Sequence, residues 1–282
     1  MKMKIKILTD TAADFTLAEY KENGVEFIPL IVSFGDIEFY DNVDITADQF
    51  YEKLTKSKFS PKSAQITPYR WQKKFEELTS DGSQLLVITL SSRLSNTYQS
   101  ACQAAATIKN VYVVDGLSAT IGQKLLVKLA IKLVNDGKEI TEIVDILNEK
   151  KKDVRIFALV DTLEYLKRGG RISSAAAIAG NIINLKPIIS VIDGEVKMVS
   201  KAIGNRRGNK AIMDLVANTN GIDFDLPWGT VYAGSMENLD KFISDCSLLF
   251  EGNEIEEVCQ IGPTIGTHVG PGAFGISYFE KK

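Results

Sequence analysis

The chain has 282 residues, of which 45% are hydrophobic and 24% are charged, and its formal net charge is −3. This composition is typical of a soluble globular protein and supplies enough apolar side chains for a sizeable core. Lys and Arg are spread along the chain without a basic, aromatic-rich stripe, so we expect no nucleic-acid partner. No apolar run is long enough to cross a bilayer, and the first residues lack the apolar stretch of a signal peptide. The three cysteines are widely spaced, which suits reduced thiols, and we expect a cytoplasmic protein.

The first 150 residues alternate between strand-like and helix-like segments. Apolar, β-branched runs predict strands at 4–8, 27–34, 85–90 and 111–114. Helices are predicted after the capping boxes Thr16–Glu19 and Thr46–Gln49, after Thr67-Pro68, and at 95–107 and 118–136. Strands that alternate with helices are typical of a parallel sheet covered on both faces.

The pattern changes in the second half. The segment 187–201 predicts a β-hairpin with Asp193-Gly194 at its turn. The other predicted elements are a strand at 155–160, helices around 162–168 and 173–184, a helix at 206–217, a strand at 230–234, a helix at 237–250 and two late strands. We therefore predict an α/β protein of two domains: an N-terminal parallel-sheet α/β domain (1–154) and a C-terminal α+β domain with a mainly antiparallel sheet (155–282).

Polar side chains follow three of the predicted parallel strands. They are Thr9, Asp10 and Thr11 after the first strand, 91–97 after the third, and Asp115 to Ser118 after the fourth. Because ligands of open α/β sheets bind at the carboxyl ends of strands, these residues could converge on an anionic or polar head group. The alternative is that they only cap helices and form Asx turns.

Other chemistries lack their sequence signals. There is no GxxxxGK[ST] loop, no GxGxxG after a strand and no GxSxG elbow. One histidine and no paired cysteines leave no metal-ligand spacing, so neither a metal nor a cofactor is expected. That histidine, His268, lies between Gly266 and Gly270 in a segment that we expect to be too glycine-rich for the interior of a regular element. His268 is either a structural hydrogen-bonding residue or a partner for a ligand's carboxyl group.

Two basic segments have no assigned chemistry at this point. Lys167, Arg168 and Arg171 surround Gly169-Gly170, where cations suit the end of a helix. The patch formed by Arg206, Arg207 and Lys210 begins a predicted helix, where the dipole does not favour cations. This patch is either a partner surface or a solvated face.

Five motifs in order carry a resemblance to a known family. They are TDTAAD (9–14), SSRLSNTYQSA (91–101), VDTLEYLKRGGRIS (160–173), KPIISVIDGEV (186–196) and IGTHVGPGAFG (265–275). Together they span nearly the whole chain, which resembles the bacterial DegV family of fatty-acid-binding proteins.

The resemblance implies a two-domain carrier whose N-terminal domain encloses an acyl chain, with the carboxyl group near the domain junction. It implies that a separate ATP-dependent fatty-acid kinase phosphorylates that carboxyl, so this chain would not be an enzyme by itself. Ser95 matches the family's carboxyl-contacting serine, Ser63 stands where the family usually has a threonine, and His268 matches its loop histidine. Arg206, with Arg207 beside it, falls near an arginine that is implicated in kinase docking. A transient contact with a membrane surface is left open.

The chain also departs from the family pattern near the expected head-group site. Ala64 replaces a hydroxyl residue of the usual T-S-Q-P-S stretch, and Asn96 replaces the glycine after Ser95. The expected carboxyl-site residues are Ser63, Ser95, Asn96 and His268. We expect the departures at Ala64 and Asn96 to affect which acyl chains are preferred. Secondary site candidates are Thr9, Asp10, Thr97, Asp115 and Gly266.

Two other functions stay open from the sequence. A lipid-processing hydrolase or acyltransferase would use Ser95 as nucleophile, His268 as base and Asp10 or Asp115 to orient the base. A binding module for a polar small molecule is the other candidate.

Overall fold

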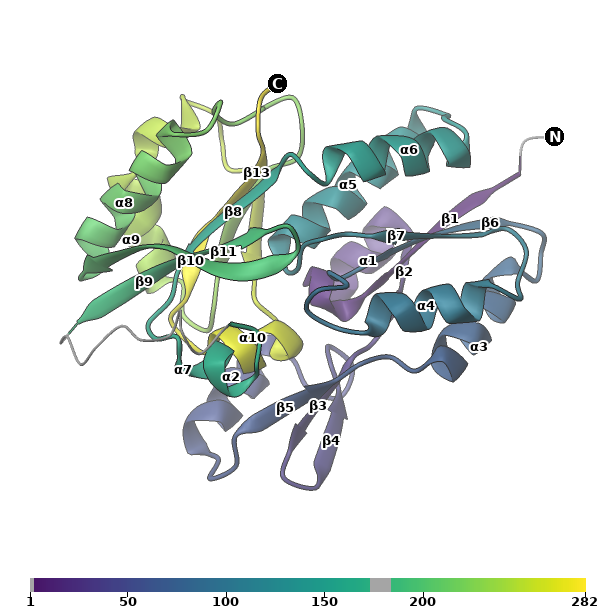
Figure 1. Cartoon of the computed structure of the whole chain (residues 1–282), viewed down its shortest axis with the longest axis horizontal. Coiled ribbons are helices and arrows are strands. Elements are labelled where there is room, and N and C mark those ends of the chain that lie inside the picture. The colour runs from purple at the N-terminus through teal and green to yellow at the C-terminus, as the bar shows by residue number, and fades with distance from the viewer. Residues whose placement is uncertain (1–2, 173–183) are drawn as a thin grey trace.

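The computed structural model describes residues 3–172 and 184–282, and its first half contains a four-stranded parallel sheet (Figure 1). The strand order is β2-β1-β6-β7. Residues 85–88 of β6 are buried completely, because helices cover both faces of the sheet. The strands are β1 (Ile5–Asp10), β2 (Val25–Ile28), β6 (Gln84–Thr89) and β7 (Val111–Asp115).

The helices of the first half lie on both sides of this sheet. In Figure 1, α5 and α6 lie above the sheet, and α3 and α4 lie below it. Both predicted capping boxes are confirmed, since Thr16 and Thr46 each accept from the backbone of the residue three positions on. The helices are α1 (Leu17–Asn23), α2 (Ala47–Lys56), α3 (Pro68–Thr79), α4 (Thr97–Ala105), α5 (Ile121–Asn135) and α6 (Ile140–Lys150), with a short 3-10 helix, η1 (Thr11–Ala13).

The prediction of one strand over 27–34 is wrong. The chain forms β2, breaks at Pro29-Leu30, and continues as β3 in a different sheet, because proline has no backbone N–H for a ladder. This small antiparallel sheet has the order β4-β3-β5 and lies at the bottom of Figure 1. Its strands are β3 (Ile31–Phe34), β4 (Ile37–Tyr40) and β5 (Pro61–Ala64).

The second half is built on a six-stranded sheet of order β10-β9-β8-β13-β11-β12. All of its pairings are antiparallel except the parallel pair β11–β12, which confirms the predicted α+β character. The strands are β8 (Val154–Leu159), β9 (Leu185–Ile192), β10 (Glu195–Ile203), β11 (Gly229–Tyr232), β12 (Glu257–Gln260) and β13 (Phe274–Phe279).

Two helix predictions in this half need correction. The helix expected over 237–250 ends at Asp245 and is followed by a 3-10 turn, η2 (Ser247–Phe250). The segment around His268, expected to be irregular, forms the helix α10 (Pro263–Val269), which starts at a proline and ends at Gly270. The helix predicted at 173–184 falls almost wholly outside the described residues. The other helices are α7 (Glu164–Arg168), α8 (Asn205–Ala217) and α9 (Glu237–Asp245).

The two faces of β8 belong to two different cores. Phe157 and Leu159 face α8 and α9, which cover the outer face of the six-stranded sheet. Ile156, Ala158 and Val160 face the opposite way and join a core that also contains the parallel sheet of the first half. Because side chains alternate along a strand, one strand serves both layers. The second half therefore presents an apolar sheet face to the first half.

The β9–β10 hairpin of the second half contacts the first half. Its turn residues Asp193 and Gly194 have φ values of 52° and 80°, as a two-residue turn of this sequence requires. The Gly194 carbonyl accepts from Ser91 Oγ at 2.7 Å, and Arg93 pairs with Glu195. A Cβ at Gly194 would lie 2.5 Å from Ser91 Oγ, so this close approach requires glycine. The hairpin tip therefore rests directly on the loop that follows β6.

Within residues 3–172 and 184–282, no helix is both long and apolar enough to cross a bilayer. The domain boundary that we predicted near residue 155 falls at the start of β8. The division into two domains stays a prediction, because α10 of the second half packs on α2, β3 and β5 of the first.

Candidate functional site

A cavity of about 390 Å³ lies between the parallel sheet and the inner face of the six-stranded sheet. That volume falls in the usual range for sites that enclose small ligands. Most of its apolar wall comes from the second half, including Ile156, Ala158, Val160, Ile189 and Val191. The resemblance placed the acyl chain inside the first half, whereas the cavity lies between the halves.

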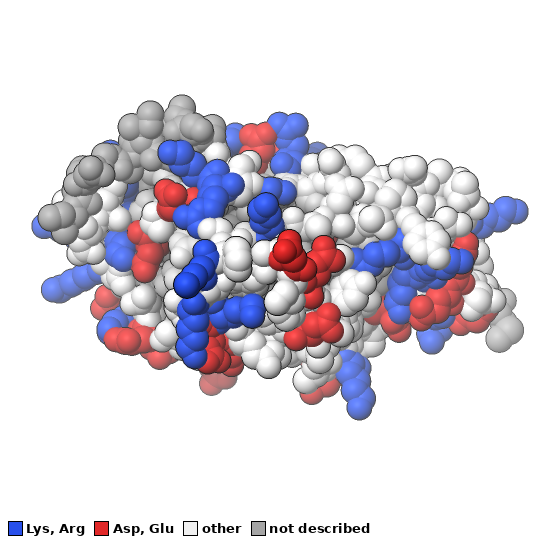
Figure 2. Space-filling model, turned by 90° about the horizontal axis from the view of Figure 1, so that it is seen from below, with Lys and Arg blue, Asp and Glu red and all other residues white. Residues whose placement is uncertain are grey.

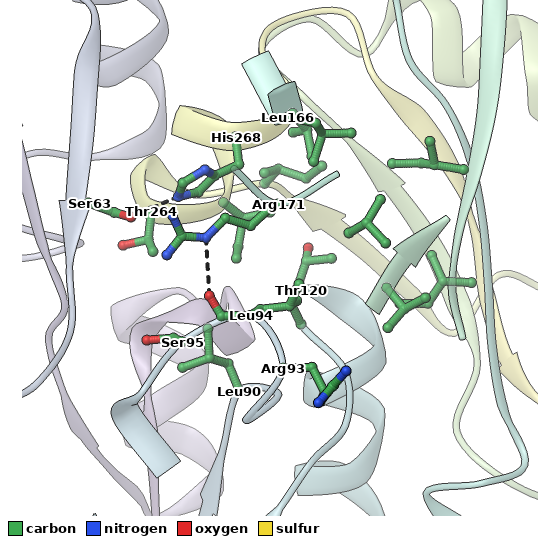
Figure 3. Close-up of a pocket in the computed structure, with 18 of the residues that line it drawn as sticks. Ser63, Leu90, Arg93, Leu94, Ser95, Thr120, Leu166, Arg171, Thr264 and His268 are labelled. Carbon is green, nitrogen blue, oxygen red and sulfur yellow. Dashed lines mark hydrogen bonds between the residues drawn. The ribbon is translucent and has the colours of Figure 1, made fainter. Parts of the chain in front are cut away.

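Figure 3 shows Ser63, Thr264, His268 and Arg171 close together at one side of this cavity. Ser63 Oγ of β5 lies 2.7 Å from His268 Nε2 of α10, although the two residues are 205 positions apart. Ser95 Oγ lies 2.9 Å from Thr97 Oγ1 and accepts from the Thr97 N–H at 3.2 Å. The structure thus places Ser63, Ser95, Asn96 and His268 around the same cavity.

His268 is held in an apolar and positively charged setting. Its ring packs against Gly169, where a Cβ would lie 2.1 Å from His268 Nδ1. Among the residues that the structure describes, none is a hydrogen-bond partner of His268 Nδ1. Burial, with the nearby charge of Arg171, lowers the pKa of His268 from 6.5 to about 4. The imidazole is therefore neutral at pH 7. One of its ring nitrogens can donate a hydrogen bond to an acid head group, and the other can accept one.

We expect the His268 imidazole of the ligand-free protein to titrate near pH 4. Because its pKa is lowered on folding, the stability that it contributes is fully present above pH 6.5 and is lost as the pH falls toward 4. His268 is the only histidine in the chain, so NMR of tag-free protein follows it without assignment. A titration midpoint near 6.5 would show that the ring is solvated instead.

Several polar residues at the cavity were missed as site residues, including Arg171, Thr120 and Thr264. Arg171 Nε donates to the Leu94 carbonyl at 3.1 Å, and Figure 3 shows its side chain between Leu94 and His268. Thr120 and Thr264 are buried and also line the cavity. In the sequence, Arg171 was interpreted as a cation that suits the end of a helix, and neither threonine was singled out as a site residue. Only the fold shows that all three line the cavity.

A second hollow of about 290 Å³ adjoins the polar end. It shares Ser63, Arg171 and His268 with the cavity, and Lys62 and Arg168 add two more cations to its wall. The shared side chains therefore separate an apolar cavity from a basic hollow.

The DegV family model matches residues 4–281. The chain belongs to the DegV family. It is 34% identical to a DegV domain-containing protein of Caldanaerobacter subterraneus, over 99% of both chains. Two solved structures match it at 28% identity and a TM-score of 0.86, covering 99% of this chain and 100% of theirs. One is described as fatty acid binding of a DegV family protein from Thermus thermophilus, and the other as DegV, a fatty acid binding protein from Bacillus subtilis.

The secondary candidates of this DegV-family chain lie behind the cavity wall. Thr9 Oγ1 donates to the Ile88 carbonyl, and Asp10 accepts from the Leu90 and Ala12 N–H groups. Burial raises the pKa of Asp10 to about 6. Asp115 accepts from the Ser92 and Leu117 N–H groups. Three strand ends were expected to converge on the site, and only the segment after β6 supplies several cavity-lining residues. The polar residues at the ends of β1 and β7 mainly form hydrogen bonds with nearby backbone groups.

Thr97 and Gly266 support the DegV-family site from outside. Thr97 contacts Ser95, as described above. A Cβ at Gly266 would lie 2.7 Å from Phe50 and 2.8 Å from Tyr51 Oη. Gly266 therefore permits the close packing of α10 on α2.

Arg206 and Arg207 are exposed at the start of α8. On the face shown in Figure 2, basic and acidic side chains are interspersed. Among the described residues, no cluster of three or more acidic, histidine or cysteine side chains could hold a metal ion.

The serine-enzyme arrangement is not assembled in this DegV-family chain. Ser63, not Ser95, contacts His268 Nε2. Asp10 and Asp115 are held by backbone N–H groups, and within residues 3–172 and 184–282 no acid contacts His268 Nδ1. A histidine with a pKa near 4 is also a weak general base at neutral pH. This geometry therefore disfavours the hydrolase alternative.

Proposed function

We propose that this chain binds a long-chain fatty acid, with the tail against the inner face of the six-stranded sheet and the carboxyl group at Ser63, Ser95 and His268. The observation that carries the proposal is a largely apolar cavity in which several polar side chains meet at one side. Apolar side chains of β8 and β9 form much of its wall, and Ser63 and His268 contact each other at that side, although Arg93, Thr120 and Ser190 also line the cavity. A ligand with a long apolar tail and one small polar head fits this distribution.

The tail supplies most of the affinity in this proposal. Burial contributes ~0.8 kcal/mol per methylene, so about fifteen methylenes contribute on the order of 10 kcal/mol before the costs of association. A net hydrogen bond contributes only about 1 kcal/mol, so the polar residues chiefly orient the head. The solved relatives from Thermus thermophilus and Bacillus subtilis, both described as fatty-acid-binding, support the same ligand class.

Calorimetric titration of delipidated protein tests the ligand class. We expect hexadecanoic acid to saturate at one molecule per chain. Octanoic acid, which has the same head and a much shorter tail, should bind far more weakly. Absence of saturation with every acyl length would contradict the proposal.

We further propose that the bound carboxyl group is presented to a separate fatty-acid kinase. The basic hollow beside the polar end supports this step, because Lys62, Arg168 and Arg171 would favour phosphoryl groups that approach the carboxyl from outside. Exposed Arg206 and Arg207 are the proposed docking residues. The chain itself would then act as a carrier rather than as an enzyme.

Replacing Ser95 with alanine tests the head-group assignment. We expect Ser95→Ala to lower fatty-acid affinity by at most about tenfold, because the tail contacts remain. Acyl-phosphate formation with a fatty-acid kinase should fall much further, because the carboxyl loses its orientation. Ser80→Ala, an exposed serine at the end of α3, is the matched control. Unchanged phosphorylation in Ser95→Ala would remove Ser95 from the site.

Reversing the charge of Arg206 and Arg207 tests the docking surface. We expect the double Glu variant to bind fatty acid normally and to require a higher concentration for half-maximal phosphorylation by the kinase. The effect should shrink at high salt, since exposed charges are screened. Lys109→Glu serves as the control, because Lys109 is an exposed cation that is distant in sequence from Arg206 and Arg207. Equal kinase titration curves for the double variant and the native protein would exclude this surface.

A further inference from the structure

The helix α10 is held at its start by two buried carboxyl groups of the first half. Its N-cap residue, Gly262, has no side chain that could cap the first turn. Instead, Asp14 Oδ1 accepts from the Gly262 N–H at 3.0 Å, and Asp41 Oδ2 accepts from the Thr264 N–H at 3.2 Å. Asp14 and Asp41 are only 7% and 1% exposed, so water does not replace these bonds.

The local structure is fitted to this arrangement. Asp14 ends η1 with a positive φ of 53°, which turns its carboxyl group toward α10. A Cβ at Gly262 would lie 2.7 Å from Asp14 Oδ1, so the carboxyl can reach the N–H only because this residue is glycine. On another side, Gly266 packs on Phe50 and Tyr51 of α2. The helix is therefore fixed between α2 and the two carboxyl groups.

This helix carries the polar end of the cavity. Thr264 and His268 both lie on it and both line the cavity. The His268 ring has little freedom, because it also packs against Gly169. A displacement of the start of α10 would therefore move His268 away from Ser63.

We propose that Asp14 and Asp41 are positioning residues, which fix α10 so that His268 and Thr264 meet the head group of the bound acid. This proposal rests on the proposed function of the cavity. It gives a role to Asp14 of the TDTAAD motif, which does not line the cavity. Neither aspartate touches the ligand in this account.

Asparagine is the conservative replacement at both positions. Burial raises the pKa of Asp14 well above its usual value, and burial raises the pKa of Asp41 to about 7. Both the charged and the neutral carboxyl can accept from a backbone N–H, as can the carbonyl oxygen of an asparagine. Alanine removes the acceptor altogether.

NMR of His268 in lipid-free, tag-free protein tests the proposal, because this is the only histidine in the chain. We expect Asp14→Ala and Asp41→Ala to shift the His268 signals and to raise its titration midpoint toward 6.5, while the Asn variants stay close to the native protein. Asp10→Ala is the matched control, since Asp10 is an equally buried carboxyl that does not contact α10. It should lower stability and leave the His268 signals in place.

Gly262→Ala and the two Asn variants decide the question if the Ala variants do not fold. Gly262→Ala keeps both carboxyl groups but separates Asp14 from α10, so it should shift His268 as Asp14→Ala would. Native His268 signals in the Ala variants, or in Gly262→Ala, would overturn the proposal, as would Asn variants that are no closer to the native protein than the Ala variants.

Fatty-acid titration of the same proteins separates this proposal from the function of the cavity. We expect the Ala variants to retain fatty acid with an affinity lowered by at most roughly tenfold, because only head-group contacts are displaced. Absence of binding by the native protein would contradict the proposed function alone. The His268 spectra would still decide whether the aspartates fix α10.

Discussion

Hexadecanoic acid should raise the melting temperature of the delipidated protein by on the order of 5 °C at about one hundred times its dissociation constant. The reason is that only the folded chain offers the cavity, so binding adds about 2.7 kcal/mol to the free energy of unfolding at that concentration. The bound tail would also add packing contacts to the wall formed by β8 and β9.

Thermal unfolding of delipidated protein across a series of acyl lengths measures this effect. The shift should grow with tail length until the cavity is filled, because each added methylene contributes to burial. Octanoic acid at the same concentration controls for nonspecific effects of the carboxylate. An equal melting temperature with and without every acid in the series would contradict a fatty-acid cavity.

Filling the cavity from inside should weaken fatty-acid binding strongly. Ala158 lies on β8 with its side chain toward the cavity, between Ile156 and Val160. In Ala158→Trp the indole would occupy the place of several methylenes of the tail. Losing contact with three of them would cost about 2.4 kcal/mol, so affinity should fall by roughly 50-fold or more.

The stability of Ala158→Trp distinguishes blocking from unfolding. Overpacking a solid core usually costs about 1–3 kcal/mol, whereas an indole that enters an existing cavity should cost less. Ala106→Trp, at an exposed position after α4, is the control for the added indole. For the native protein, Ala158→Trp and Ala106→Trp, calorimetry measures the fatty-acid affinity and thermal unfolding measures the stability. Native affinity in a folded Ala158→Trp protein would show that the tail lies elsewhere.

The sequence predicts best those elements whose signals are local. The capping boxes at Thr16 and Thr46 form with both of their hydrogen bonds, and Asp193-Gly194 forms the hairpin turn. The three-stranded sheet was not predicted, because β4 is largely exposed and β4 and β5 have only four residues each. Such strands exist through pairing with β3, which no local pattern encodes.

The candidate site could be predicted only in part, for a similar reason. Motifs indicated Ser63, Ser95, Asn96 and His268, and all four line the same cavity. The helical state of the segment around His268 was missed, because its glycines suggested a loop. Those glycines instead permit close contacts with Asp14 and α2.

Other parts of the site depend on contacts between distant segments. Arg171 reaches Leu94 across 77 positions, and Asp14 reaches Gly262 across 248. The cavity itself exists only because the inner face of one sheet meets the loops of another. Its position between the halves follows from tertiary packing and not from any local sequence pattern.

Mass spectrometry of the protein purified without added lipid tests the central claim most directly. Under native conditions, we expect a mass that exceeds the chain by one long-chain fatty acid, and organic extraction should release that acid in about equal amount to the protein. A chain that carries no acyl lipid, and that takes up none when hexadecanoic acid is supplied, would contradict the account.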